Sequence, residues 1–267
     1  MLLKPIERQF QINGFYSAFP FRWNEHYTFH GESHDFWEIV FVTAGKVEAT
    51  EDEKIYTLEK NNIVLHAPME FHRIRSAGGT RPEGFIMSFA SKGNLPNELR
   101  EGVFVLDGEQ AQAYLAICLK AKSLMEETAD APYAGQEVVD LLSAFLIKLS
   151  NERTERQLSS SPAAMEYRRA VSVMRERVCD NSTLSELAAA CNISVSYLKL
   201  LFKKYAGISP KAYYTHLRVR HATKLLGDGV PASVVANQMS FSSPNYFSTF
   251  IKKQTGLMPS AHKKARH

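Results

Sequence analysis

The chain has 267 residues, of which 45% are hydrophobic and 22% are charged, the composition of an ordinary globular protein. No stretch approaches the roughly 18 consecutive apolar residues that a membrane span requires, and the first ten residues lack the apolar run of a secretory signal. We therefore expect a cytoplasmic protein without membrane contact. Its three cysteines show no Cys-x-x-Cys spacing, which argues against a disulfide framework and a cysteine-built zinc site.

Charge divides the chain into two parts. Residues 1–160 carry 16 Lys and Arg against 23 Asp and Glu, a net charge of −7, whereas residues 161–267 carry 16 against 5, a net charge of +11. This asymmetry indicates that the second part meets a polyanion and that the first does not. Charge alone does not exclude the alternative that these lysines only keep helix faces solvated.

In chain order, residues 15 to about 107 show a hydrophobic period near two. A strand is expected over residues 36–43, followed by a turn at 44–46. Further short strands are expected over residues 47–50, 54–58, 63–66 and 84–89. Many short strands separated by Gly, Asn and Pro predict an all-β sandwich or small barrel.

Two helical patterns follow the strands. Apolar residues recur at helical spacing over residues 109–127, and over residues 135–151 they cover more than one helix face. A helix that is apolar around so much of its girth packs on two surfaces, its own domain and another such as a second subunit. Residues 151–166 are then polar, contain Ser-Ser-Ser-Pro and lack apolar periodicity, which predicts a linker.

The basic part contains a repeat with an offset of 49 residues. Tyr, Lys-Lys, Gly and Pro recur at equal spacing in YLKLLFKKYAGISP (197–210) and YFSTFIKKQTGLMP (246–259). Each copy predicts an amphipathic helix that ends on Gly and then meets Pro, which cannot continue it.

The residues before each copy identify the repeated unit. In LSELAAACNIS (184–194), a short helix carries Ala188 where a second helix would press close, and Asn192 stands at a turn that favours positive φ. Ser194 or Ser196 can then cap the next helix. This pattern predicts a helix-turn-helix, with its second helix offered to a major groove. The second copy repeats it with one extra residue in the turn.

The C-terminal part resembles the DNA-binding domain of the AraC/XylS family of bacterial transcription regulators. The resemblance lies in SYLKLLFKKYAGISPKAY, YYTHLRVRHATKLL and NYFSTFIKKQTGLMPSAH and covers about residues 165–265. It implies two helix-turn-helix units, joined by a long helix over about 211–226, that read successive major-groove turns. Many relatives carry Arg where Leu200 and Thr249 stand here and Gly where Ser240 stands, which implies fewer strong base contacts and an altered second turn.

Residues on the outward face of the two recognition helices are candidates for base contacts. They are Ser194, Ser196, Lys199, Pro244, Asn245, Ser248 and Thr249. Because Asn binds adenine and Lys donates to guanine, Asn245 and Lys199 are the best candidates for sequence readout.

The lysines near the helix ends are expected to contact phosphate, and they are Lys203, Lys204, Lys252 and Lys253. The alternative is that all these side chains only solvate the helices. The aromatic residues of both helices, Tyr246 among them, are expected to be core.

The acidic part resembles, more weakly, the cupin-type β-barrel that many AraC-like regulators use as a sensor. The resemblance lies in HDFWEIV (34–40), a turn at Gly45, NIV (62–64) and PMEFH (68–72). It implies that the barrel binds a small effector in its mouth and that the helices after it dimerise.

Three polar residues of this part invite a metal interpretation. His34 and Glu38 share strand parity, and His72 can approach from another strand. Metal-binding cupins, however, usually show a His-x-His pair, and Glu32 stands where its first His would be. We therefore expect no metal and no cofactor, and instead a polar cluster within an effector pocket. A satisfied structural cluster is the alternative.

The aromatic residues ahead of the cluster suit the walls of a ligand pocket, although most of them are expected to be core. Arg22 and Trp23, near the N-terminal arm, are added to the candidate effector pocket.

These features predict an α+β multidomain fold. It comprises a cupin-like β-barrel sensor (1–107), helices for dimerisation (108–153), a linker (154–164) and an all-α tandem helix-turn-helix domain (165–267). The predicted function is a sequence-specific transcription regulator, with no catalytic residues, controlled by a small-molecule effector for which the resemblance favours a carbohydrate. Its expected partners are double-stranded operator DNA, a second copy in a homodimer and, for an activator, RNA polymerase.

Two other classes of protein stay open. One is a cupin enzyme, an isomerase or oxygenase, with His34, Glu38 and His72 on iron or manganese, against which the tandem repeat argues. The other is a constitutive architectural DNA-binding protein with an inactive barrel.

Overall fold

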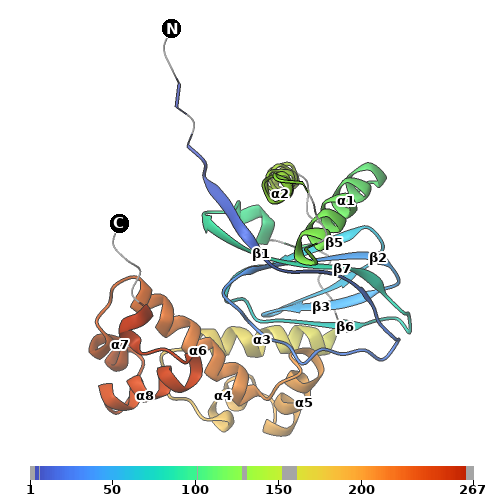
Figure 1. Cartoon of the computed structure of the whole chain (residues 1–267). Coiled ribbons are helices and arrows are strands. Elements are labelled where there is room, and N and C mark those ends of the chain that lie inside the picture. The colour runs from blue at the N-terminus through green and yellow to red at the C-terminus, as the bar shows by residue number, and fades with distance from the viewer. Residues whose placement is uncertain (1–3, 6, 101, 128–130, 152–160, 263–267) are drawn as a thin grey trace. The chain divides into compact units, whose positions relative to one another are not determined.

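The computed structural model describes residues 4–5, 7–100, 102–127, 131–151 and 161–262. The chain forms two compact units, Met1–Ser159 and Ser160–His267 (Figure 1). Within the described residues, the first unit combines strands with helices and the second consists of helices. Every helix in these ranges is too short or too polar to span a bilayer.

The strands of the first unit form two antiparallel sheets. One sheet has five strands in the order β1-β7-β2-β5-β8, and the other has three in the order β4-β3-β6. The bounds are β1 Phe10–Arg22, β2 Trp37–Ala44, β3 Val47–Glu51, β4 Lys54–Leu58, β5 Asn62–His66, β6 His72–Ser76, β7 Glu83–Gly93 and β8 Phe104–Val105, with a short 3-10 helix η1 at Asn97–Arg100.

Side chains of the five-stranded sheet alternate between its two faces, as the pleat of a strand requires. Ile39 and Phe41 of β2 belong to a core shared with α1 (Gly108–Met125) and α2 (Ala134–Ser150). Val40 and Val42 of the same strand belong to a second core shared with the three-stranded sheet. The five-stranded sheet is therefore covered on one face by two helices and on the other by the smaller sheet (Figure 1).

The sequence predicts most of this arrangement. The expected strands at 36–43, 47–50, 54–58, 63–66 and 84–89 correspond to β2, β3, β4, β5 and β7, and both expected helices are confirmed as α1 and α2. Strand β1 was not among the expected strands. Its pairing with β7 shifts register between Ile12 and Gly14 and again between Phe15 and Ser17. Such irregularities break the two-residue period by which a strand is found in a sequence.

The second unit contains six α-helices and a short 3-10 helix among the described residues. They are α3 Pro162–Glu176, α4 Leu184–Ala190, α5 Val195–Tyr205, α6 Pro210–Gly227, α7 Ala232–Gln238, α8 Pro244–Thr255 and η2 Pro259–His262. The long central helix expected over about 211–226 is confirmed as α6.

The end of the predicted linker (154–164) is wrong, because α3 begins at Pro162. The Ser161 side chain accepts a hydrogen bond from the Ala164 amide at 3.2 Å, and Pro162 occupies the first turn. Ser-Pro is therefore a helix start here, since Ser caps an N-terminus and Pro tolerates the first helical position. Residues 154–160 lie outside the described residues.

The two helix-turn-helix turns differ by one residue, as predicted. Residues 191–194 separate α4 from α5, and residues 239–243 separate α7 from α8. Each turn contains one residue in the left-handed region, Asn192 (φ 52°) in the first and Ser240 (φ 55°) in the second. Asn tolerates this conformation through its short polar side chain, whereas Ser is less suited to it.

A buried arginine ties the central helix to the segment before α4 and to the turn before α8. Arg218 of α6 is 7% exposed. Its guanidinium donates to the Met239 carbonyl at 2.6 Å and to Asn181 Oδ1 at 3.2 Å, and it lies 4.6 Å from the centre of the Phe241 ring. Arg218 thus links the segment before α4 with the turn before α8.

We expect Ser240→Gly to raise the free energy of unfolding by about 0.5–1 kcal/mol, because glycine adopts a positive φ without steric cost. Urea denaturation measures the change. Ser242→Gly is the matched control, since it adds the same backbone freedom at a position of the same turn without a positive φ. A loss of stability in Ser240→Gly, or an equal gain in both variants, contradicts the explanation.

Candidate functional site

The first recognition helix, α5, exposes the residues predicted to contact bases. Ser194, Ser196 and Lys199 are exposed, whereas Leu198 and Leu201 are buried. Ser194 also caps the helix, because its hydroxyl accepts a hydrogen bond from the Tyr197 amide at 3.1 Å. Ser194 therefore begins the helix in the fold, and Lys199 is the residue of this face with a charged donor group.

The second recognition helix, α8, exposes Pro244, Asn245 and Thr249, with Ser248 half-buried. The Ser248 hydroxyl donates to the Pro244 carbonyl at 2.9 Å, and the Thr249 hydroxyl donates to the Asn245 carbonyl at 3.0 Å. Both hydroxyl protons are thus engaged within the helix, which leaves these two side chains as acceptors. Asn245 offers an amide with both donor and acceptor atoms.

The prediction that Tyr246 belongs to the core is wrong. Its side chain is 59% exposed, while Phe247 and Ile251 on the same helix are fully buried. Residues 247 and 251 lie one turn apart and share a face, whereas residue 246 lies about 100° away from 247 around the helix axis. Tyr246 therefore joins the exposed surface of α8.

The four lysines predicted to contact phosphate are exposed in the last turns of α5 and α8. They are Lys203, Lys204, Lys252 and Lys253. Positive charge in this position also stabilises a helix through its dipole. Each pair therefore has a local role in the fold and leaves ammonium groups on the same surface as the recognition helices.

In the first unit, the structure brings His34, Glu38 and His72 together, as the strand parity predicts. Glu32 completes the group, and one ligand atom from each residue lies within 4.8 Å of the others. His72 Nε2 lies 3.5 Å from Glu38 Oε1 and 4.0 Å from Glu32 Oε1, and His34 Nε2 lies 4.0 Å from Glu38 Oε2. We call these four residues the polar cluster.

Strand register explains why the polar cluster forms. Glu38 has the same parity as Val40 and therefore points between the two sheets. Its partners on the neighbouring strands are His66 of β5 and Ser88 of β7, and directly paired residues point to the same face of a sheet. From the opposite sheet, β6 supplies His72.

Sequence reasoning missed a second layer of polar residues behind the cluster. The His66 ring stacks on the His72 ring with centroids 4.3 Å apart, and His66 Nδ1 lies 3.1 Å from Glu51 Oε1. His66 and Glu51 are both buried from solvent. Strand parity was the available signal, because His66 is two residues after the inward-facing Val64.

Backbone carbonyls orient the two histidines of the polar cluster. His34 Nδ1 lies 2.9 Å from the Phe36 carbonyl oxygen, and His72 Nδ1 lies 3.2 Å from the Glu70 carbonyl oxygen. A carbonyl only accepts, so each Nδ1 carries the proton and each Nε2 presents a lone pair to the cluster. Neither Nε2 has a hydrogen-bond partner in the protein.

Burial controls the protonation of this region. It raises the pKa of Glu38 to about 7, with the charge of Glu32 adding to the effect. It raises the pKa of Glu51 to about 8 and lowers the pKa of His66 to about 3. The pKa of His72 falls well below its usual value through burial first and then the charges of His66 and His34. Imidazoles in the cluster are therefore neutral at pH 7, as lone-pair donors must be.

The structure does not bring Arg22 to the polar cluster. Arg22 pairs with Glu83 at the far end of β7, whereas Glu38 pairs with Ser88. Five residues along a strand correspond to about 17 Å. The Arg22 side chain is 79% exposed and lies 2.8 Å from Glu83 Oε1. Arg22 therefore does not belong to the polar cluster, and its assignment to an effector pocket stays a prediction.

Trp23 approaches the cluster only through a neighbour. Its ring stacks on Tyr27 with centroids 4.1 Å apart. Burial raises the pKa of the Tyr27 phenol, and the charges of Glu32 and Glu38 raise it further. Tyr27 thus contacts Trp23 and is influenced by the charges of two carboxylates of the cluster.

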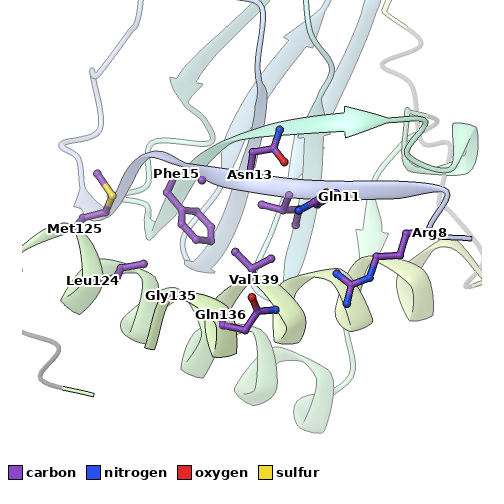
Figure 2. A pocket seen from close by; sticks show the side chains of 11 residues that line it. Arg8, Gln11, Asn13, Phe15, Leu124, Met125, Gly135, Gln136 and Val139 are labelled. Atoms are coloured by element: carbon purple, nitrogen blue, oxygen red, sulfur yellow. The ribbon is translucent and has the colours of Figure 1, made fainter. Parts of the chain in front are cut away.

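A groove of about 530 Å³ lies between β1 and the helices α1 and α2 (Figure 2). Figure 2 shows Phe15 of β1 and Val139 of α2 facing each other across it, with Arg8 at one end. Its lining contains none of the predicted effector residues and consists of Arg8, Gln11, Ile12, Asn13, Gly14, Phe15, Leu124, Met125, Gly135, Gln136 and Val139. The groove lies on the helix side of the five-stranded sheet and the polar cluster on the other side.

We expect Glu51→Gln to reduce the pH dependence of stability. In the unfolded chain this carboxyl ionises near pH 4.5, whereas in the fold its pKa is about 8. The fold therefore loses stability as pH rises from 4.5 to 8, and the amide removes this contribution, on the order of 2–4 kcal/mol at pH 8. Urea denaturation from pH 5 to 8 with a chelator present measures the slope. An unchanged slope in the variant contradicts the assignment.

Comparisons with known proteins identify regulators as relatives. The uncharacterized HTH-type transcriptional regulator YijO of Escherichia coli is 28% identical over 134 residues, 49% of this chain and 47% of that protein. The raffinose operon transcriptional regulatory protein RafR of Pediococcus pentosaceus is 31% identical over 101 residues, 38% of this chain and 36% of that protein. The chain thus spans less than half the length of these two relatives. The uncharacterized HTH-type transcriptional regulator YidL of Escherichia coli is 24% identical over 84% of this chain and 74% of its own length.

Among solved structures, ToxT from Vibrio cholerae is 13% identical and covers 96% of this chain and 98% of its own, with a TM-score of 0.37. The family model described as a helix-turn-helix domain matches residues 187–265. The model described as an AraC-like ligand binding domain matches residues 17–167, more than half of the chain. The chain therefore belongs to the AraC-like family of transcription regulators, with an AraC-like ligand-binding domain ahead of its helix-turn-helix domain.

Proposed function

We propose that the protein regulates transcription by binding operator DNA through its two helix-turn-helix units, under the control of a small molecule bound by the first unit. The observation that carries the proposal is the duplication. Two units of the same construction each present an exposed, polar recognition helix, within a part of the chain that carries a net charge of +11. A polyanion with a repeating groove is the partner that such a pair of helices fits.

The proposal assigns separate roles to the exposed residues. Asn245 and Lys199 read base edges, because an amide can pair with adenine and an ammonium can donate to guanine. The lysine pairs at the ends of α5 and α8 contact phosphates, which sets affinity and position but carries no sequence information. Tyr246, exposed beside Asn245, adds to the contact surface of α8.

The effector is proposed to contact His34, Glu38 and His72 in the polar cluster. The support is their inward orientation and the two Nε2 lone pairs without a protein partner. RafR is by its name a raffinose operon regulator, so we take carbohydrates as the first effector class to test. An effector switches transcription only if it binds one arrangement of the protein better than the other. A regulator of this kind works in the cytoplasm, and one that activates would also contact RNA polymerase.

The effector and DNA roles distinguish this function from the two alternatives. An effector-dependent rise in melting temperature supports a sensor and argues against an architectural protein with an inactive barrel. Sequence-specific retention of DNA argues against an enzyme as the main activity of the chain.

The first unit is proposed to mediate a homodimer through α1 and α2. Leu119 of α1 is 52% exposed and Ile147 of α2 is 52% exposed. A separate groove of about 400 Å³ on the same two helices is lined by Ala113, Ala116, Ile117, Lys120, Leu141, Ala144, Phe145 and Lys148. Exposed apolar side chains on both helices favour association. Two linked DNA-binding modules also bind at a high effective concentration, which a dimer provides.

We expect Asn245→Ala to weaken binding mainly to the cognate operator, by about 1–3 kcal/mol, and Lys252→Ala to weaken binding to all sequences alike. Loss of one phosphate contact should also reduce the salt slope by about one. Fluorescence anisotropy with the chain's own upstream DNA and with random DNA, across a salt series, measures both. Lys224→Ala, an exposed lysine of α6 outside the recognition helices, is the charge-matched control. Equal losses on both DNAs for Asn245→Ala would refute its role in readout.

We expect Ile147→Glu to shift the monomer–dimer equilibrium toward monomer by about 10–100-fold, because a charge in an apolar interface must be desolvated. Sedimentation equilibrium measures the dissociation constant. Val105→Glu introduces the same charge at a residue of β8 that is 49% exposed and is part of neither helix. A wild-type chain that is monomeric at all concentrations, or equal effects of both variants, rules out this interface.

A further inference from the structure

We propose that the polar cluster of Glu32, His34, Glu38 and His72 is a binding site for one divalent transition-metal ion. Sequence analysis expected no metal because Glu32 replaces the first histidine of a His-x-His pair. The structure weakens that objection, since Glu32 itself points a carboxylate into the group. This inference deepens the proposed ligand role of the same site, but it concerns binding and is testable without DNA.

The distances between the donor atoms suit one shared ion. Ligands at 2.0–2.2 Å from a tetrahedral ion lie about 3.4 Å from one another. The measured pairs are 3.5 Å between His72 Nε2 and Glu38 Oε1, and 4.0 Å both between His72 Nε2 and Glu32 Oε1 and between His34 Nε2 and Glu38 Oε2. All donor atoms of the group lie within 4.8 Å of one another, so each pair must close by at most about 1.4 Å to reach the separation around one ion.

The orientation of the two histidines is a second, independent observation. Both donate their Nδ1 proton to a backbone carbonyl, of Phe36 for His34 and of Glu70 for His72. A metal-binding histidine characteristically donates its other ring N–H to a carbonyl or carboxylate, which sets the tautomer and aims the lone pair. This arrangement occurs at both His34 and His72, and the two Nε2 lone pairs point into the same group of carboxylates.

The surroundings hold the ligands in place. The His34 ring stacks on Phe36 with centroids 3.7 Å apart, and the His72 ring stacks on His66. The Ser88 hydroxyl donates to Glu38 Oε2 at 3.2 Å. The side chain of His72 is 1% exposed, whereas that of Glu32 is 49% exposed, so an ion can enter past Glu32 and meet the buried ligands behind it.

Two nitrogen atoms of the cluster lack a partner in the protein. Nε2 of His34 and Nε2 of His72 are both buried without a hydrogen bond, and a buried polar atom without a partner is costly in free energy. An ion satisfies both lone pairs and both carboxylates at once.

The donor set indicates the class of ion. Two imidazole nitrogens and two carboxylates favour a first-row transition metal such as zinc, cobalt or iron over magnesium and calcium, which prefer oxygen ligands alone. No thiolate takes part, because the described residues of the cluster include no cysteine. Zinc and cobalt are therefore suitable probes.

The test uses the full chain, stripped of metal with a chelator and dialysed. Zn²⁺ binding is followed by isothermal titration, and Co²⁺ binding by its visible absorption, whose intensity and position report the coordination geometry. We expect one ion per chain and a melting temperature that rises with free Zn²⁺.

Variants assign the ion to the cluster. Glu38→Gln keeps the size of the side chain and can accept from Ser88, and it removes a buried carboxyl, so the variant should fold. We expect Glu38→Gln and His34→Ala each to weaken Zn²⁺ binding more than about 100-fold. Loss of a residue that binds the ion directly costs more affinity than loss of a residue that only hydrogen-bonds to such a ligand. His30→Ala, an exposed histidine of the same segment, is the matched control and should bind as the wild type does.

Two results would overturn the proposal: no stoichiometric Zn²⁺ or Co²⁺ binding by the wild type, or equal affinity in wild type, Glu38→Gln and His34→Ala. DNA binding measured on the same metal-free wild-type sample separates this failure from failure of the proposed function. Sequence-specific DNA binding without metal binding leaves regulation standing and removes the metal site. Metal binding without any DNA binding supports the metal site and contradicts the proposed regulation of transcription.

Discussion

The two-residue alternation of β2, β5 and β7 is the constraint on which the first unit depends. One set of side chains, with Ile39 and Phe41, packs against α1 and α2, and the other, with Val40 and Val42, packs against the three-stranded sheet. Because the alternation has no exceptions along these residues, Glu38 must point between the sheets. The polar cluster is thus a consequence of register. A slip of one residue would move Glu38 to the helix face and an apolar side chain into the cluster.

Burial gives the cluster its chemistry. In water, Glu38 would be ionised and His72 half-protonated near pH 6.5, but between the sheets the charged form of each group is disfavoured. The region therefore holds neutral imidazoles beside the buried carboxyl of Glu38. Glu32, half exposed, is the member of the cluster that reaches solvent.

The second unit depends on a buried arginine, Arg218. Helices α4 and α7 have seven residues each. Helices this short bury little apolar surface, so core packing alone does little to fix their orientation. Arg218 compensates by binding the Met239 carbonyl at the second turn and Asn181 near the first helix-turn-helix. A buried guanidinium has five donors in a fixed plane, so its partners are held in defined positions. The exposed faces of α5 and α8 are then presented on a rigid support within this unit.

The sequence by itself determined the repeat, the helix caps and the two turns, because these are local. Asn192 and Ser240 adopt positive φ where the pattern placed the turns, and α6 lies where the long helix was expected. It also grouped His34, Glu38 and His72, since parity is a local property. Only the tertiary structure decided the rest. It placed His66 and Glu51 behind the cluster, separated Arg22 from it and exposed Tyr246, because these outcomes depend on pairings and packing between residues distant in the chain, which no local pattern encodes.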